Sequence, residues 1–449
     1  MNYFRDTFGR APTVGILTLG CKVNQYESEA IAEECKKSGI TVSSPDFSCD
    51  FYVVNSCSVT AEADRKSCQM IRRLKKLNPL SVMIVTGCSA QRESGRIAKI
   101  DGVDYIVGNA AKMKCAEIIA DIAENGTVHR NSPEIIIPSV DSAAFERMKI
   151  TAYPRTRQVI KIEDGCENRC AYCAIPDGRG TVRSKAPADV LEEVLEFCRN
   201  GCREIVLTGI ETASYGRDTG DRLDDLLVML DRECGEFGVR FRLGSVSPLL
   251  FTEEFVSRVS SLKSAAHHFH ISMQSGSDSV LAGMRRHYTS SEAGEALKRV
   301  RKAMPDVMFT TDIIVGFPGE TDADFAETAA FILEHKFLYT HIFPYSRRDG
   351  TPAATMPRQV AEEVKKKRAA TLADVAAMSR TSAVNGFIAS GSPIEVLIET
   401  YKDGKLYGHS GNFLDAVADG DPSLRGQVLR LDPVRYEDGV VICKMHKEQ

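Results

Sequence analysis

The chain has 449 residues, of which 43% are hydrophobic and 26% are charged, with a formal net charge of -4. This length allows about three domains. We find no apolar run of the roughly 18 residues that a membrane span needs, and the first residues lack the apolar stretch of a signal peptide. We therefore expect a cytoplasmic protein without a membrane partner, in which any nucleic acid binds at local basic patches.

The fourteen cysteines point to metal sites or catalysis, because a cytosolic protein rarely carries a disulfide framework. Over residues 11–125, short apolar runs alternate with helical stretches. The expected strands are Thr13–Leu19, Phe51–Val54, Val82–Val85 and Tyr105–Val107. The expected helices are Glu27–Lys37, Glu62–Leu77, Arg92–Lys99 and Ala111–Ala123. This alternation predicts a doubly wound α/β domain with a parallel sheet.

Three cysteines of this domain, Cys21, Cys57 and Cys88, each follow an expected strand directly; we call them the N-terminal triad. The carboxyl ends of parallel strands share the edge at which ligands bind, so three thiols converge there. We expect a metal site. The alternative is that these are buried thiols, since free cysteine is among the most buried residue types, as we expect for the helical Cys35, Cys68 and Cys115.

Residues 126–157 form a polar connector with three prolines and are expected to be a linker. Six strands follow in residues 158–385: Val159–Ile162, Glu204–Leu207, Arg240–Val246, His267–Met273, Met308–Val315 and Tyr339–Phe343. Helical stretches separate them, namely Ala188–Arg199, Leu223–Glu233, Ser291–Lys302 and Asp322–His335. Six units fall short of the eight of a closed TIM barrel, so we predict an open, partial TIM-like barrel.

The first of these strands leads into Cys166-Glu-Asn-Arg-Cys170-Ala-Tyr-Cys173, whose thiols we call the loop triad. Thiolates at this spacing can each hold one iron of a [4Fe-4S] cluster, which normally takes four. With three, one iron keeps an open position for a small chelating molecule. The alternatives are a zinc knuckle and buried thiols, but no fourth Cys or His lies at zinc-ligand distance.

Other strand ends carry residues suited to a small ligand. Gly209 and Glu211 follow the second strand, Gln274 and Ser275 the fourth, and Gly316 the fifth. Simple turns are the alternative. The segment His267-His268-Phe-His270 alternates between two faces of a strand, so we interpret these histidines as strand residues, not as ligands of one metal. Four arginines near strand ends are candidates for phosphate contacts: Arg179, Arg183, Arg347 and Arg348.

After a helix at Val360–Met378, residues 386–449 show short alternating strands and are predicted to form a small all-β barrel. The expected strands are Pro393–Thr400, Leu406–Tyr407, Phe413–Val417, Gly426–Leu431 and Gly439–Met445. Residues 384–449 contain seven Lys or Arg against ten Asp or Glu, which disfavours RNA binding dominated by this part.

The segment Leu19-Gly-Cys-Lys-Val-Asn-Gln-Tyr-Glu27, with the other N-terminal triad loops and the loop triad, resembles the methylthiotransferase family of radical S-adenosylmethionine (SAM) enzymes. The resemblance implies a second [4Fe-4S] cluster on Cys21, Cys57 and Cys88, and SAM contacts at the second, fourth and fifth strand ends. The C-terminal part resembles the TRAM domain, an RNA-binding module. One SAM would methylate a sulfur at the N-terminal cluster; the second would be cleaved at the loop triad to abstract a hydrogen atom.

The motif around Cys21 is most similar to the enzymes acting on threonylcarbamoyladenosine. This resemblance implies 2-methylthiolation of that nucleoside at tRNA position 37. The implied partners are tRNA, an electron donor such as flavodoxin or ferredoxin, and a sulfur donor. Alternatives within the family are an isopentenyl-type adenosine in tRNA and an aspartate of a ribosomal protein. An alternative of another class is a non-catalytic iron-sulfur protein that binds RNA or senses redox state.

Overall fold

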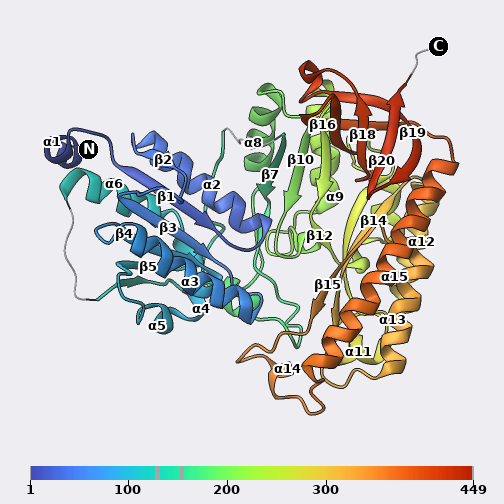
Figure 1. Cartoon of the computed structure of the whole chain (residues 1–449), viewed down its shortest axis with the longest axis horizontal. Helices are drawn as coiled ribbons and strands as arrows, with labels where there is room; N and C mark the ends of the chain where they lie inside the picture. Colours follow the sequence, from blue (N-terminus) through green and yellow to red (C-terminus); the bar gives the residue numbers. More distant parts are fainter. Residues whose placement is uncertain (1, 127–131, 152–155, 447–449) are drawn as a thin grey trace. The chain divides into compact units, whose positions relative to one another are not determined.

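The structure, a computed structural model, describes residues 2–126, 132–151 and 156–446 (Figure 1). These residues form two compact units. The first holds the described parts of Met1–Tyr153, Glu163–Lys185 and Arg347–Thr351. The second holds those of Pro154–Ile162, Ala186–Ser346 and Pro352–Gln449. The loop triad thus belongs to the same unit as the N-terminal triad, although it lies in the expected central domain.

A six-stranded sheet with the order β2-β1-β3-β4-β5-β6 organises the first unit. Its strands are β1 (Thr13–Thr18), β2 (Thr41–Ser43), β3 (Phe51–Ser56), β4 (Val82–Gly87), β5 (Tyr105–Val107) and β6 (Glu134–Ile136). All pairings are parallel. The strands β3 and β4 are buried along their whole length, as expected for strands covered on both faces. The predicted doubly wound fold is confirmed.

Helices of this unit cover both faces of the sheet. They are α1 (Asn2–Phe8), α2 (Lys22–Lys37), α3 (Ala61–Leu77), α4 (Cys88–Arg92), α5 (Ser94–Ile97), the 3-10 turn η1 (Asn109–Ala111) and α6 (Lys114–Asn125). Alternate residues of β3 enter two separate cores. Phe51 and Val53 pack with Ile119 of α6, whereas Tyr52 and Val54 pack with Ile71 of α3. Because successive side chains of a strand point to opposite faces, β3 packs against helices on both sides of the sheet.

Several features of this unit differ from the expected elements, and α1 and β2 were not expected. Helix α2 begins at Lys22, directly after Cys21, and α4 begins at Cys88 itself. The expected helix Arg92–Lys99 is instead the pair α4 and α5. Strand β6 lies in the expected linker; it pairs with β5 at the edge of the sheet, where the prolines before and after it are tolerated.

The segment with the loop triad is fastened at both ends. Strand β8 (Glu163–Asp164) pairs antiparallel with β9 (Arg183–Ser184), and α7 (Ile175–Arg179) lies between them. Gly165 adopts a φ of +87, and a Cβ there would lie 1.9 Å from the carbonyl oxygen of Thr181. Only glycine fits this turn, which directs the chain from β8 into the cysteine loop.

The second unit begins with a curved array of parallel strands. They are β7 (Arg157–Lys161), β10 (Glu204–Thr208), β11 (Arg240–Leu243), β12 (Ser245–Val246), β13 (His268–Gln274), β14 (Met308–Val315) and β15 (Tyr339–Pro344). They form the sheets β11-β10-β7 and β12-β13-β14-β15. The expected strand Arg240–Val246 is divided into β11 and β12 at Gly244. The sequence order is also the spatial order, which confirms the open TIM-like arrangement.

Helices follow the strands of this array (Figure 1). They are α8 (Pro187–Arg199), η2 (Thr212–Ser214), α9 (Leu223–Cys234), η3 (Gly235–Phe237), η4 (Pro248–Leu250), α10 (Glu253–Val259), α11 (Asp278–Gly283), α12 (Ser290–Ala303), α13 (Asp322–His335), α14 (Pro352–Thr355) and α15 (Glu362–Ala389). Helix α15 runs eleven residues beyond the expected Met378, so the expected domain boundary at residues 385/386 falls inside it.

A closed barrel with the order β16-β17-β18-β20-β19 ends the chain. Its strands are β16 (Ile394–Lys402), β17 (Lys405–Ser410), β18 (Asp415–Asp419), β19 (Val428–Glu437) and β20 (Val440–Met445), with the turn η5 (Pro422–Leu424). Val396, Leu406 and Val441 are among its core residues, and Phe387 of α15 joins them. The predicted small all-β barrel is confirmed. No helix in the described ranges has the length and apolar character to cross a membrane.

Candidate functional site

The structure brings the N-terminal triad together at one edge of the six-stranded sheet. Cys21 caps α2 after β1, Cys57 follows β3, and Cys88 opens α4 after β4. The loops approach closely: a Cβ on Gly20 would lie 2.9 Å from Cys57 Sγ. A positive φ of +105 at Gly20 and of +98 at Gly87 allows these turns. The thiols thus gather where ligands bind to such sheets.

The electrostatic environment of the N-terminal triad suits metal ligands. Cys57 and Cys88 are buried, whereas Cys21 is exposed. Burial, with a smaller contribution from the other two cysteines, raises the pKa of the Cys57 thiol to about 12, against the opposing effects of a backbone hydrogen bond at Val59 and of the charge of Arg179. A metal takes cysteine as the thiolate, so a cation beside the thiols favours the ligand form.

A network of buried charges lies next to these cysteines. Arg179, Glu27 and Lys112 have fully buried side chains. Arg179 Nη1 donates to Glu27 Oε1 at 2.5 Å and to Asp164 Oδ1 at 3.1 Å. Lys112 Nζ donates to Glu27 and, at 3.0 Å, to Asn55 Oδ1. Buried charges are tolerated only when paired in this way, so the network requires all its members.

The loop triad lies between β8 and α7. Cys170 is buried, and Cys166 and Cys173 are partly exposed. The backbone N–H of Cys166 donates to the carbonyl of Gly180 at 3.0 Å, and that of Ile175 donates to Cys173 Sγ at 3.4 Å. The loop is therefore ordered by its own backbone, and partly exposed thiols remain accessible to a metal and a small chelator.

A set of three side chains in the described ranges has its possible metal-ligand atoms within 4.8 Å of one another: His270, Asp312 and His341. The cysteine triads offer three thiols each, and a [4Fe-4S] cluster takes one thiolate per iron.

The residues predicted to contact SAM lie at the carboxyl ends of β10, β13 and β14. Glu211 is buried and accepts from the backbone N–H of Ser247 at 2.9 Å. Burial raises the pKa of Glu211, and the charge of Arg286 opposes the rise. The nearby hydroxyls of Thr212 and Ser214 are buried without a described hydrogen-bond partner. Such polar groups fit an incoming ligand with ammonium and carboxylate groups.

The remaining predicted SAM residues have mainly backbone roles. Gln274 and Gly316 adopt positive φ angles of 71 and 74. The Ser275 hydroxyl bonds to that of Thr328 in α13 at 3.1 Å. The N–H of Gly316 donates to Glu320 Oε2 at 2.6 Å. Gly209 lies half-buried after β10. SAM binding by these five residues stays a prediction.

Three of the four arginines predicted to contact phosphate are buried: Arg179, Arg183 and Arg348. Arg183 donates to the carbonyl of Val140 at 2.7 Å, and Arg348 pairs with Asp64 of α3. Their burial argues against the predicted role, because phosphate contacts require surface groups. Position near a strand end does not reveal burial, and the phosphate contacts of these arginines stay a prediction. Arg347 is exposed and remains a candidate.

The strand histidines are engaged within their sheet. His268 and His270 bond to the hydroxyl of Thr310 at 3.0 and 2.8 Å, so they share one face of β13. His267 pairs with Asp306 at 2.6 Å. His268 and His270 are therefore strand residues, as expected, whereas His267 lies just before β13. The nearby cluster of His270 with Asp312 and His341 comes from three neighbouring strands and has no signal in the sequence.

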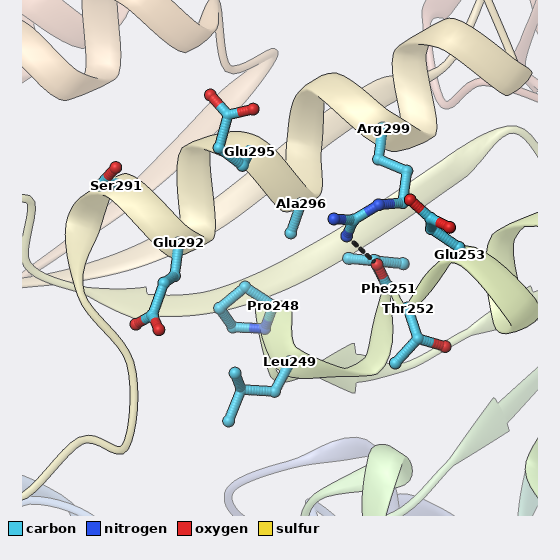
Figure 2. Close-up of a pocket in the computed structure, with 10 residues that line it drawn as sticks. All are labelled: Pro248, Leu249, Phe251, Thr252, Glu253, Ser291, Glu292, Glu295, Ala296 and Arg299. Carbon is cyan, nitrogen blue, oxygen red and sulfur yellow. Dashed lines mark hydrogen bonds between the residues drawn. The ribbon is translucent and has the colours of Figure 1, made fainter.

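Figure 2 shows a hollow of a different character, between η4 and α12. Arg299 of α12 donates there to the carbonyl of Phe251 at 2.5 Å. The hollow is lined by Pro248, Leu249, Phe251, Thr252, Glu253, Ser291, Glu292, Glu295, Ala296 and Arg299. It contains no cysteine and none of the residues predicted to contact SAM, so it is separate from the predicted site.

Known proteins match the chain over nearly its whole length. The Radical SAM superfamily profile matches residues 160–332, and that of "Uncharacterized protein family UPF0004" matches residues 13–108. The chain is 38% identical over 445 residues to the threonylcarbamoyladenosine tRNA methylthiotransferase MtaB of Bacillus subtilis (strain 168), covering 97% of this chain and 98% of that protein. The chain belongs to the methylthiotransferase family of radical SAM enzymes. Because the members of this family are enzymes, the match argues against the alternative of a non-catalytic iron-sulfur protein.

Other relatives carry two kinds of name. This methylthiotransferase is 40% identical to MtaB of Thermotoga maritima, over 79% of this chain and 80% of that protein. It is 32% identical to the tRNA-2-methylthio-N(6)-dimethylallyladenosine synthase of Pelotomaculum thermopropionicum, over 92% and 93%. Among solved structures, the radical SAM methyltransferase TsrM of Kitasatospora setae matches with a TM-score of 0.57 and 14% identity, over 77% of each chain. That likeness supports the radical SAM fold.

Proposed function

We propose that this methylthiotransferase converts N6-threonylcarbamoyladenosine at position 37 of tRNA to its 2-methylthio derivative. The observation that carries the proposal is the 38% identity, over nearly the full length of both chains, to the Bacillus subtilis enzyme named for this nucleoside. The segment Lys22-Val-Asn-Gln25 after Cys21 supports the same substrate. Asn24 is buried beneath the cysteine, where it bonds to the carbonyls of Leu19 and Ser56 at 2.8 and 3.1 Å.

The six triad cysteines fit two [4Fe-4S] clusters. Cys166, Cys170 and Cys173 would hold the cluster that binds SAM, and Cys21, Cys57 and Cys88 the second. When bound, these groups supply an electron, a radical and a methylated sulfur for the reaction. The protein's part is to hold them: Glu211 would orient the ammonium of SAM, and the buried charge network would fix the N-terminal triad.

The proposed reaction requires tRNA as a partner. It also requires a reductant, such as flavodoxin or ferredoxin, and a sulfur donor. Arg347 is the predicted phosphate contact that the surface offers. Acidic residues outnumber basic ones in the C-terminal barrel. This favours recognition of RNA through its shape and through base stacking over contacts with phosphate charges. A cytoplasmic location agrees with these partners and stays a prediction.

Mass spectrometry of nucleosides from total tRNA, with and without this gene, tests the substrate. Loss of the 2-methylthio form, with threonylcarbamoyladenosine accumulating, is the expected result. The control is restoration by the wild-type gene but not by Cys166→Ala. An unchanged level of that nucleoside with loss of 2-methylthio-isopentenyladenosine would assign the chain to the second group of relatives. Loss of neither would direct attention to the ribosomal-protein aspartate.

A further inference from the structure

The guanidinium of Arg179 contacts the N-terminal triad. Its Nε donates to Cys88 Sγ at 3.3 Å. Its Nη2 donates to Asn24 Oδ1 at 2.5 Å, and the Cys21 thiol donates to the same oxygen at 3.9 Å. The side chain of Arg179 is fully buried. This cation therefore contacts one cysteine directly and a second through a shared acceptor.

The same guanidinium also contacts the segment that holds the loop triad. Arg179 ends α7, which starts two residues after Cys173. Its Nη1 donates to Asp164 Oδ1 at 3.1 Å, and Asp164 precedes Cys166 by two residues. With its bonds to Glu27 and Asn24, Arg179 uses all five of its N–H donors. A residue so fully engaged holds a fixed position between the two cysteine sites.

Backbone packing brings the two loops together at the same place. Asn109 Nδ2 donates to the carbonyl of Gly178 at 2.5 Å and to Cys88 Sγ at 3.7 Å. A Cβ on Gly178 would lie 3.5 Å from Cys88 Cβ, which is ordinary contact. Helix α7 thus packs against the first turn of α4, and Arg179 lies at this contact.

The charge of Arg179 has a specific consequence for a metal cluster. Hydrogen bonds to cluster sulfurs and nearby charge set the reduction potential. A positive donor stabilises the reduced state most, since that state carries one more negative charge. The carboxylates of Glu27 and Asp164 hold the guanidinium charged, because they raise its pKa against the effect of burial.

We propose that Arg179 is a positioning residue for both cysteine sites: it raises the reduction potential of the N-terminal cluster through Cys88 and holds the loop triad beside it. The proposal rests on the cluster assignment of the proposed function but not on the substrate. It replaces the phosphate contact predicted for this arginine. Failure of the substrate test would leave it standing, because a potential is measured without tRNA.

The test isolates the N-terminal cluster in protein with Cys166, Cys170 and Cys173 all changed to Ala. Its midpoint potential is measured by redox titration followed by electron paramagnetic resonance, with and without Arg179→Lys. The expected result is a shift to lower potential of at least about 59 mV, which is tenfold in the one-electron equilibrium constant. Lysine keeps the charge but loses the fork of donors. An unchanged potential in a variant that still holds four irons would overturn the proposal.

Arg183→Lys in the same background is the matched control. Arg183 is buried in the same segment and lies 3.3 Å from Asp164, but it bonds to the carbonyls of Val140 and Arg179, not to a sulfur. It should leave the potential unchanged, and an equal shift in both variants would contradict a specific contact with Cys88. If Arg179→Lys fails to fold, the paired change Asp164→Asn with Arg179→Gln removes the cation with one of its carboxylates and keeps the buried Lys112–Glu27 pair. A lowered potential is again expected, and an unchanged one overturns the proposal.

Discussion

The two cysteine sites of this methylthiotransferase are built in opposite ways. The loop triad lies in a single short loop, whose shape is set by its own backbone and by Gly165. The N-terminal triad is assembled from three loops that are distant in sequence and meet at a sheet edge above buried charges. The comparison teaches that a local site depends on backbone conformation, whereas an assembled site depends on the packing of the whole domain. A substitution at one kind of site should therefore leave the other kind intact.

Gly165→Ala should have the largest effect. The added Cβ would lie 1.9 Å from the Thr181 carbonyl oxygen, at a φ of +87 that disfavours a side chain. We expect loss of the loop cluster and of SAM cleavage, measured as 5'-deoxyadenosine formed under reducing conditions. The N-terminal cluster should persist, with about four irons per chain. Gly178→Ala, whose Cβ would meet nothing closer than 3.5 Å, is the tolerated control. Loss of both clusters in Gly165→Ala would contradict the separation.

Glu27→Ala should act on the assembled site. The substitution leaves the buried cations Lys112 and Arg179 without their shared carboxylate. Breaking a buried ion pair costs about 3–5 kcal/mol. Urea titration of the metal-free protein should therefore show a lower free energy of unfolding. Glu62→Ala, which breaks an exposed pair with Arg65, should leave it unchanged. Equal stability of the two variants would show that the network is not required.

Glu211→Gln should have a smaller effect, confined to SAM. Loss of a charged acceptor costs roughly tenfold in affinity, and we expect a KM for SAM higher by that factor with both clusters present. Because burial raises the pKa of Glu211, its carboxylate takes up a proton at higher pH than an exposed glutamate does. The wild-type KM should therefore rise as the pH falls through that raised pKa, whereas the variant should lack this dependence. A parallel pH response in both proteins would place the titrating group elsewhere.

The same contrast explains what could be predicted from sequence. The spacing of Cys166, Cys170 and Cys173 indicates their chemistry directly, because the ligands share one loop. The N-terminal triad could be predicted only through strand order, which the alternation of elements supplied. The burial of side chains could not be predicted from the sequence. Arg179 and Arg348 were expected at the surface, because their carboxylate partners Glu27 and Asp64 lie far away in sequence. Strand β6 was missed because its apolar run is only three residues long and stands between Pro133 and Pro138, which indicated a linker.

The measurement that tests the account most directly compares Cys57→Ala with Cys166→Ala under reducing conditions, with SAM and tRNA present. 5'-Deoxyadenosine and the 2-methylthio nucleoside are quantified in the same reactions. We predict that Cys166→Ala forms neither product, and that Cys57→Ala still forms 5'-deoxyadenosine but no methylthio nucleoside. Loss of both products in both variants, with the other cluster intact by iron content, would contradict separate roles for the two cysteine sites.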